Sequence, residues 1–221
     1  MMQHTPQAQY RKTGITLPEL LVALSVFAIV IALVLNFYKE ALVDTHFEAK
    51  KNELNSSLRT ITSELLLHAR QSDYILLYKS FNPRDRKSAD DRLFEGKAGD
   101  LLVMVTQGKG KENQLSNKRP IVKIIGYYRD PESSKNPQTK GPLKRFVVEI
   151  PKGSSKAPEE LIPQRESKKF KEMAPTVLGL TNERSFYNLN NKNIIANMSL
   201  STGSGDYQYS HRLNLTLSPK E

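Results

Sequence analysis

A run of apolar residues from Leu20 to Leu35 constrains this chain more than any other feature of its sequence. The run contains no charged residue, and Ser25 is its one polar side chain. With the apolar residues that flank it, the stretch reaches roughly 24 residues, and about 20 helical residues are enough to span the hydrocarbon core of a bilayer. We therefore expect one membrane-spanning helix over residues 15–38.

The two ends of this run indicate how the helix is oriented. Residues 36–40 follow the run, and no small-residue cleavage site of a secretory signal peptide lies there, so the segment is expected to stay with the protein. Arg11 and Lys12 precede the run. By the positive-inside rule, residues 1–14 are expected in the cytoplasm and everything after Tyr38 on the other side of the membrane.

A single carboxylate, Glu19, lies at the head of the apolar run. An ionised carboxylate is costly inside a membrane, and a chain that carries one there usually uses it. The alternative is an ordinary signal anchor in which Glu19 lies at the level of the lipid headgroups, where a charge costs little. Hydropathy alone leaves both interpretations open.

The residues around Glu19 form a wider motif. The motif begins with a glycine (Gly14) and an apolar residue (Ile15). It continues with Thr-Leu, a variable residue, Glu19 and an aliphatic run. This order resembles the prepilin-type signal of type IV pilins and type II secretion pseudopilins, although Ile15 stands where phenylalanine is usual. The resemblance implies that a prepilin peptidase cuts between Gly14 and Ile15 and methylates the new amine of Ile15. It also implies that Glu19 serves filament assembly by pairing with the terminal amine of a neighbouring subunit.

A second stretch of helix is expected beyond the membrane. Proline and glycine are absent from residues 39–81. Apolar residues recur there at helical spacing, which predicts an amphipathic helix over residues 39–70 that continues the first one. Two helices joined by a hinge near Asn36 are the alternative. The apolar stripe is formed by Phe47, Leu54, Leu58, Ile61 and Leu65.

Short apolar runs and a closing pair of alternating segments predict an antiparallel sheet after this helix. In the last segment His211 is expected on the inner face. Residues 79–100 and the basic residues 151–174 are expected to be loops, the second with a short helix near residues 159–161. A long helix packed on an antiparallel sheet is an α+β fold. The expected strands are 101–105, 121–128, 146–150, 194–200 and 207–217.

The charge of the chain is uneven. The formal net charge is +10, and many of the lysines and arginines lie between Lys109 and Lys171 in segments rich in Gly, Ser and Pro. These segments are interpreted as solvated loops, and a face that binds a polyanion such as DNA is the alternative. The chain has no cysteine, which excludes a disulfide framework and a thiolate metal site.

The sequence offers no candidate active site. His46 and His68 are separated by roughly 33 Å along a helix, too far to share a metal ion. The acidic residues within residues 79–100 have no calcium-loop spacing. We therefore expect a protein that is not an enzyme and has no metal or cofactor.

The resemblance also implies a function and its partners. The order of these strands also resembles the larger minor pseudopilins or PilW-like minor pilins. A strand that follows Gly99-Asp100 comes first, then a strand with Tyr127-Tyr128, and then one that carries Arg145. We expect a minor structural subunit of a type II secretion pseudopilus or a type IV pilus, with the prepilin peptidase, other pilins or pseudopilins and an inner-membrane assembly platform as partners. The expected location is the inner membrane, with residues 39–221 as a periplasmic domain. A DNA-uptake or adhesive minor pilin, and a signal-anchored sensor or lipid-binding domain, are the alternatives.

Overall fold

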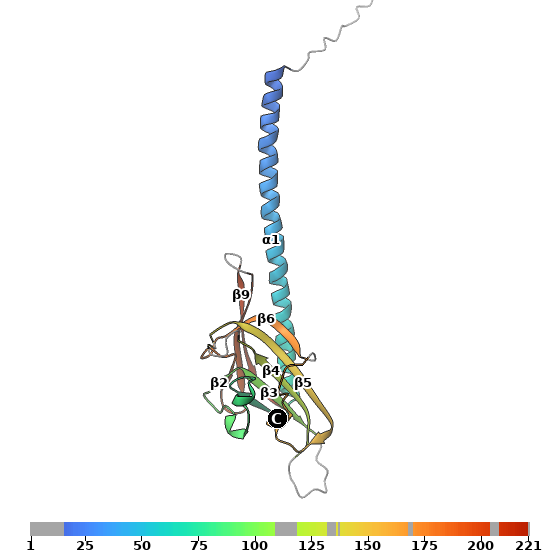
Figure 1. The fold of residues 1–221 in the computed structure, drawn as a ribbon, viewed down its shortest axis with the longest axis vertical. Coiled ribbons are helices and arrows are strands. Elements are labelled where there is room, and N and C mark those ends of the chain that lie inside the picture. Colours follow the sequence, from blue (N-terminus) through green and yellow to red (C-terminus); the bar gives the residue numbers. More distant parts are fainter. Residues whose placement is uncertain are drawn as a thin grey trace, which may run out of the picture. The chain divides into compact units, whose positions relative to one another are not determined.

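The computed structural model describes residues 16–108, 119–131, 136, 138–167, 170–203 and 208–220. The chain forms two compact units, Met1–Glu48 and Ala49–Glu221. One helix, α1 (Leu17–Gln71), contributes to both of them (Figure 1). Its course through Asn36 is unbroken, so the alternative of two separate helices is wrong.

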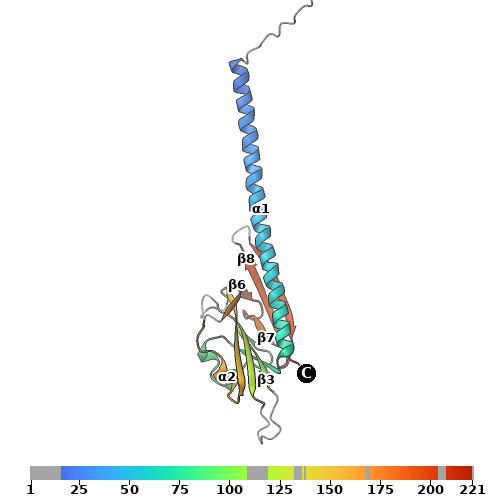
Figure 2. The same cartoon turned by 90° about the vertical axis from the view of Figure 1, so that its right-hand side faces the viewer.

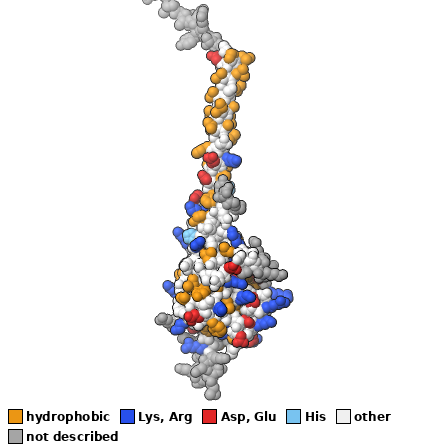
Figure 3. Space-filling view, turned by 90° about the vertical axis from the view of Figure 1, so that its left-hand side faces the viewer, with side chains coloured by type: hydrophobic (Ala, Val, Ile, Leu, Met, Phe, Trp, Pro, Cys, Tyr) orange, Lys and Arg blue, Asp and Glu red, His pale blue; other side chains and the backbone are white. Residues whose placement is uncertain are grey.

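The first unit consists, in its described part, of the first half of α1, most of which is the apolar stretch. The large apolar side chains from Leu17 to Tyr38 are all exposed, with Leu17 and Phe37 each at 73% of their full accessibility. Figure 3 shows hydrophobic side chains along this stretch. By length and composition α1 is able to span a membrane, and among the described residues it is the one helix that passes this test.

The second unit is built on a nine-stranded sheet in which every pairing is antiparallel. The strand order is β1-β3-β4-β5-β6-β8-β7-β2, and β9 pairs with β8. The expectation of an α+β fold, with a long helix on an antiparallel sheet, is therefore confirmed. The strands are β1 (Tyr74–Tyr78), β2 (Ala98–Gly99), β3 (Leu101–Gln107), β4 (Ile121–Arg129), β5 (Gly141–Ser154), β6 (Lys171–Gly179), β7 (Phe186–Asn188), β8 (Ile194–Thr202) and β9 (Tyr209–Leu217); the short helices are α2 (Pro158–Leu161) and the 3₁₀ turns η1 (Pro83–Asp85) and η2 (Ala89–Asp91).

One face of the sheet packs against the last turns of α1 (Figure 2). The helix contributes the buried residues Leu54, Leu58, Ile61, Leu65 and Ala69, which continue the predicted stripe. Because these side chains recur every three or four residues, they form one apolar ridge along the helix.

The other face of the sheet has a core of its own. Leu101 and Val103 point into this second core, whereas Leu102 points toward α1, so β3 is buried on both faces. Burial on both faces explains why its sequence is a continuous apolar run rather than an alternating one. Aromatic rings fill the second core: Phe81 stacks on Tyr128 at 4.3 Å between ring centroids.

The predicted strands are present, and three details of the sequence analysis were wrong. The segment 151–174 is not one loop, because β5 continues through Ser154 and β6 begins at Lys171. The segment 79–100 contains the short strand β2 and two 3₁₀ turns. His211 is exposed, while Leu213 on the same face of β9 is buried. Alternation assigns a residue to a face, but burial also requires another element to cover that part of the strand.

A prediction about stability arises from Gly126 in β4, which pairs with Phe146 in β5. A Cβ at Gly126 would overlap the Phe146 ring, and this ring is fully buried against Phe81 and Phe170. We expect Gly126→Ala to lower the free energy of unfolding by about 2–3 kcal/mol, because the ring has no free space to move into. Chemical unfolding followed by tyrosine circular dichroism measures the loss. A shorter side chain in Phe146→Leu should make the two substitutions less than additive, and full additivity would contradict this explanation.

Candidate functional site

The first candidate site is the beginning of helix α1. The carboxylate oxygen Oε2 of Glu19 accepts hydrogen bonds from the backbone N–H of Thr16, at 2.9 Å, and from its hydroxyl, at 2.8 Å. The first helical bond runs from Leu20 N–H to the carbonyl of Thr16, at 3.1 Å. A Glu three residues after a Thr that precedes the helix is the spacing of a capping box, and Pro18 fits the first turn because its missing N–H is not needed there.

This arrangement fixes the direction of the Glu19 carboxylate. The carboxylate turns back over the start of the helix, toward the N–H and hydroxyl of Thr16. Gly14 and Ile15, the predicted cleavage and methylation residues, lie outside the described residues. Of the predicted site residues, the structure therefore places Glu19.

The apolar stretch from Leu20 to Leu35 carries one side-chain hydroxyl, that of Ser25, and this hydroxyl is hydrogen-bonded within the helix. Ser25 Oγ donates to the carbonyl of Leu21 at 2.8 Å, so this group needs no partner outside the helix. A helix with satisfied backbone and an apolar surface is suited to lipid or to packing against similar helices.

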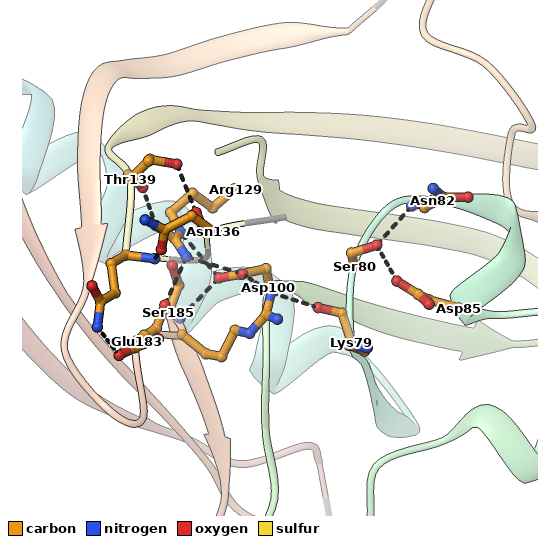
Figure 4. A network of polar contacts seen from close by, with 12 residues as sticks. Lys79, Ser80, Asn82, Asp85, Asp100, Arg129, Asn136, Thr139, Glu183 and Ser185 are labelled. Atoms are coloured by element: carbon orange, nitrogen blue, oxygen red, sulfur yellow. Dashed lines mark hydrogen bonds and ion pairs between the residues drawn. The ribbon is translucent and has the colours of Figure 1, made fainter. Parts of the chain in front are cut away.

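The second candidate site is a buried polar network at one end of the sheet (Figure 4). The carboxylate of Asp100 accepts two bonds from Arg129, each at 3.0 Å, one from Arg184 at 2.6 Å and one from the backbone N–H of Ser185 at 3.1 Å. The side chains of Asp100 and Arg129 are fully buried. Arg129 also donates to the carbonyls of Thr139 and Glu183, at 2.8 and 2.7 Å.

The Asp100 network holds three parts of the chain together. It joins the entry to β3, the end of β4 and the turn between β6 and β7. Asn182 and Glu183 in that turn have left-handed backbone angles, with φ of 48° and 64°. Such angles are unfavourable for residues other than glycine, and the bond from Arg129 to the Glu183 carbonyl helps to hold them. Both carboxylate oxygens of Asp100 and all three guanidinium nitrogens of Arg129 are engaged in hydrogen bonds within the chain, which favours a scaffolding role.

A third polar cluster joins α1 to β4, β5 and β6. His68 Nδ1 lies 2.7 Å from the hydroxyl of Tyr127, and Glu64 forms ion pairs with Arg145 at 2.5 Å and with Lys171 at 3.5 Å. Partial burial lowers the pKa of His68, and the nearby Arg145 lowers it further, while Glu64 opposes the shift. The neutral form of His68 is therefore favoured in the folded chain.

A pH dependence of stability follows from His68. The unfolded chain has the ordinary histidine pKa of 6.5 and takes up a proton below it, whereas the folded chain takes it up at a lower pH. The free energy of unfolding is therefore expected to fall as pH drops from 6.5 toward the folded pKa, by less than the limit of about 1.4 kcal/mol per pH unit because His68 is partly exposed. Unfolding of His68→Gln beside the unmodified chain at pH 7.5 and 5.5 checks this: the variant should lose less stability on acidification. Equal losses would contradict it.

The Asp100 network was not predicted from the sequence, whose predicted site residues are Gly14, Ile15 and Glu19. Asp100 is separated from Arg129 by 29 positions and from Arg184 by 84, so no local spacing reveals their contact. The one signal was Gly99-Asp100 before an apolar strand, because an acidic residue entering a buried strand requires a partner. Among the described residues, no group of three His, Cys, Asp or Glu side chains is placed to hold a metal ion.

Comparison with known proteins gives one match. Residues 10–35 match the prokaryotic N-terminal methylation motif, which includes Gly14, Ile15, Glu19 and the apolar run. No curated protein and no solved structure matches the chain. The chain thus carries, at residues 10–35, an N-terminal methylation motif consistent with the prepilin signal of the type IV pilin and pseudopilin family, and this motif supports a pilin-like or pseudopilin-like protein.

Proposed function

We propose that this chain is a minor structural subunit of a type II secretion pseudopilus or a type IV pilus. The observation that carries the proposal is the methylation motif at residues 10–35, joined directly to a helix whose apolar side chains are exposed from Leu17 to Tyr38. An apolar surface of this extent needs lipid or other apolar helices around it. Membrane insertion before assembly, and helix packing in a filament afterwards, meet this need in turn.

In this proposal the precursor is cut between Gly14 and Ile15, and the amine of Ile15 is methylated. The new amine then lies one residue before Thr16, close in sequence to the carboxylate that Thr16 holds over the helix start. An amine and a carboxylate are each costly in a helical core of low dielectric, and pairing them offsets much of that cost. Glu19 of one subunit would pair with the amine of its neighbour and set the axial position of the two helices.

The proposal also assigns location and partners. The prepilin peptidase, other pilins or pseudopilins and an inner-membrane assembly platform are the partners, and the protein acts as a structural subunit rather than an enzyme. The chain crosses the inner membrane once, with residues 1–14 in the cytoplasm and residues 39–221 in the periplasm. The size of the second unit favours a minor subunit, because bulky insertions crowd the surface of a repeating fibre.

The DNA-uptake or adhesive alternative depends on the basic segments. Residues 109–118, 132–135 and 168–169, which carry many of those lysines, lie outside the described residues. No contact or surface among the described residues favours this alternative over a structural subunit. We therefore keep the structural role as the single proposal.

Mass analysis of the chain from its native host tests the proposal. The unmodified chain is expected to begin at a methylated Ile15, and Gly14→Ala is expected to retain residues 1–14, because the peptidase requires a glycine before the cut. Thr13→Ala is the matched control and should be processed normally, since it leaves the glycine in place. If the unmodified chain still begins at Met1 or Met2, the protein is an ordinary anchored domain and the proposal fails.

A further inference from the structure

A pocket of about 330 Å³ lies between the turn η1 and the helix α2 in the second unit. Its wall includes two basic and two acidic side chains, so the formal charges of the lining cancel. The pocket shares no residue with the methylation motif, and its binding chemistry is independent of the proposed function. The lining residues are Pro83, Arg86, Lys87, Glu159, Glu160 and Gln164.

Arg86 is a buried cation whose hydrogen bonds are incomplete. The residue is 2% exposed, and its Nε and Nη2 donate to the carbonyls of Phe81 and Pro163, at 2.9 and 2.7 Å. The guanidinium lies 4.8 Å from the centroid of the Phe81 ring. The remaining nitrogen, Nη1, is buried without a hydrogen-bond partner. A buried guanidinium with unpaired N–H groups is costly, so this atom calls for an acceptor.

Glu159, another residue of the pocket lining, supplies the complementary group. The residue is 4% exposed, and its Oε1 accepts from the Tyr78 hydroxyl and from Arg92 Nε, both at 2.7 Å. Burial by itself would raise the pKa of Glu159, but these two bonds outweigh burial and lower it, so the group is ionised. Its second oxygen, Oε2, is buried without a hydrogen-bond partner and calls for a donor.

The free hydrogen-bonding atoms and the charges of the lining limit which ligands can bind. Arginine binds carboxylates and phosphates best through two parallel N–H groups from different nitrogens, and here only one nitrogen is free. A single carbonyl oxygen suits that nitrogen. An anion would also meet the two carboxylates of the lining, and a cation would meet Arg86 and Lys87.

We propose that this pocket binds an amide group, whose carbonyl oxygen accepts from Arg86 Nη1 and whose N–H donates to Glu159 Oε2. An amide is neutral and carries both an acceptor and a donor, as the two unpartnered atoms require. Because both atoms are buried, entry requires exposed lining side chains to rotate; Lys87 and Gln164 are exposed and long enough to do so. The amide belongs either to a primary carboxamide or to the main chain of a polypeptide.

Saturation-transfer NMR with small probes tests this proposal on the full chain in detergent micelles. The probes are acetamide, N-methylacetamide and acetate, which are similar in size and differ in their donors and charge. At least one of the two amides is expected to bind saturably with a roughly millimolar Kd, and acetate at least tenfold more weakly. Tighter binding of N-methylacetamide identifies a main-chain peptide group, and tighter binding of acetamide identifies a primary carboxamide.

Two variants and empty micelles complete the experiment. Arg86→Lys removes Nη1 and should weaken amide binding at least tenfold, whereas Arg84→Lys, at an exposed arginine of η1, should leave it unchanged. If Arg86→Lys does not fold, the comparison of amides with acetate on the unmodified chain still decides. Three outcomes would each overturn the proposal. Acetate binds as tightly as the amides, no probe binds saturably beyond empty micelles, or a folded Arg86→Lys variant binds the amides as well as the unmodified chain does.

Discussion

Replacing Asp100 with asparagine is expected to lower the free energy of unfolding of the second unit by about 3–5 kcal/mol. The carboxylate and Arg129 are both fully buried, and Arg184 and the Ser185 N–H bind the same two oxygens. Asparagine keeps the shape but removes the charge and gives one terminal atom only donors. Two arginines would then face a neutral amide without water to solvate them. Guanidinium chloride unfolding of the full chain in mild detergent, followed by tyrosine circular dichroism, measures the difference.

Asp130→Asn is the matched control for this substitution. Asp130 follows Arg129 and forms an ion pair with Lys144 at 3.2 Å, but its side chain is 53% exposed. Exposed pairs of this kind contribute about 0–1 kcal/mol, so the control should be nearly neutral. Similar losses for the two variants would show that burial of the Asp100 network does not decide its contribution.

The helix was predictable from sequence because its signals are local. The apolar run and the absence of proline and glycine predicted a helix from residue 15 to about 70, and α1 spans Leu17–Gln71. The stripe from Leu54 to Leu65 was also predicted, since a helical repeat of 3.6 residues brings those positions to one face.

Strand β6 was not predicted, because its sequence has neither of the local patterns that indicate a strand. Lys171 and Glu172 are exposed at its start and Pro175 interrupts it, so the segment has neither alternation nor a continuous apolar run. Proline in a strand usually indicates an irregularity or an edge. The β5–β6 pairing in fact shifts register near Leu143 and Ala174, which leaves room for this residue. β6 forms through its pairing with β5 and β8, strands distant in the sequence, and no local sequence pattern indicates this pairing.

The polar interior was missed for a related reason. From the sequence, Glu159 was expected in a short helix within a basic loop. In the structure it is buried and hydrogen-bonded to Tyr78 and Arg92, which are 81 and 67 positions away. A charged residue in a loop-like sequence is usually solvated. Only the fold shows which of the many charges are buried and which residues they contact, and this is why the sequence does not reveal the partners of Glu159 and Asp100.

Glu19→Gln is expected to reduce incorporation into filaments roughly tenfold or more while leaving membrane insertion and cleavage intact, because an unpaired terminal amine in the helical core is not tolerated. This prediction rests on the proposed function. Glutamine can still accept from the N–H and hydroxyl of Thr16, so the start of α1 is expected to persist. The loss should therefore reflect the missing charge and not a frayed helix. Immunoblots of the sheared filament and membrane fractions from the native host measure it, after normalisation to the cleaved chain.

The comparison with Glu40 separates a specific role of Glu19 from a general effect of removing a negative charge from the helix. Glu40 is an exposed glutamate of the same helix, beyond the apolar stretch, and Glu40→Gln should assemble normally. Glu19→Asp keeps the charge on a shorter side chain and should recover part of the assembly. If Glu19→Gln is cleaved and incorporated as well as Glu40→Gln, then the carboxylate serves only to begin the helix and the pairing with a neighbouring amine is wrong. If Glu19→Gln remains uncleaved, Glu19 acts at the peptidase step, because assembly can be judged only on a chain whose amine has been released.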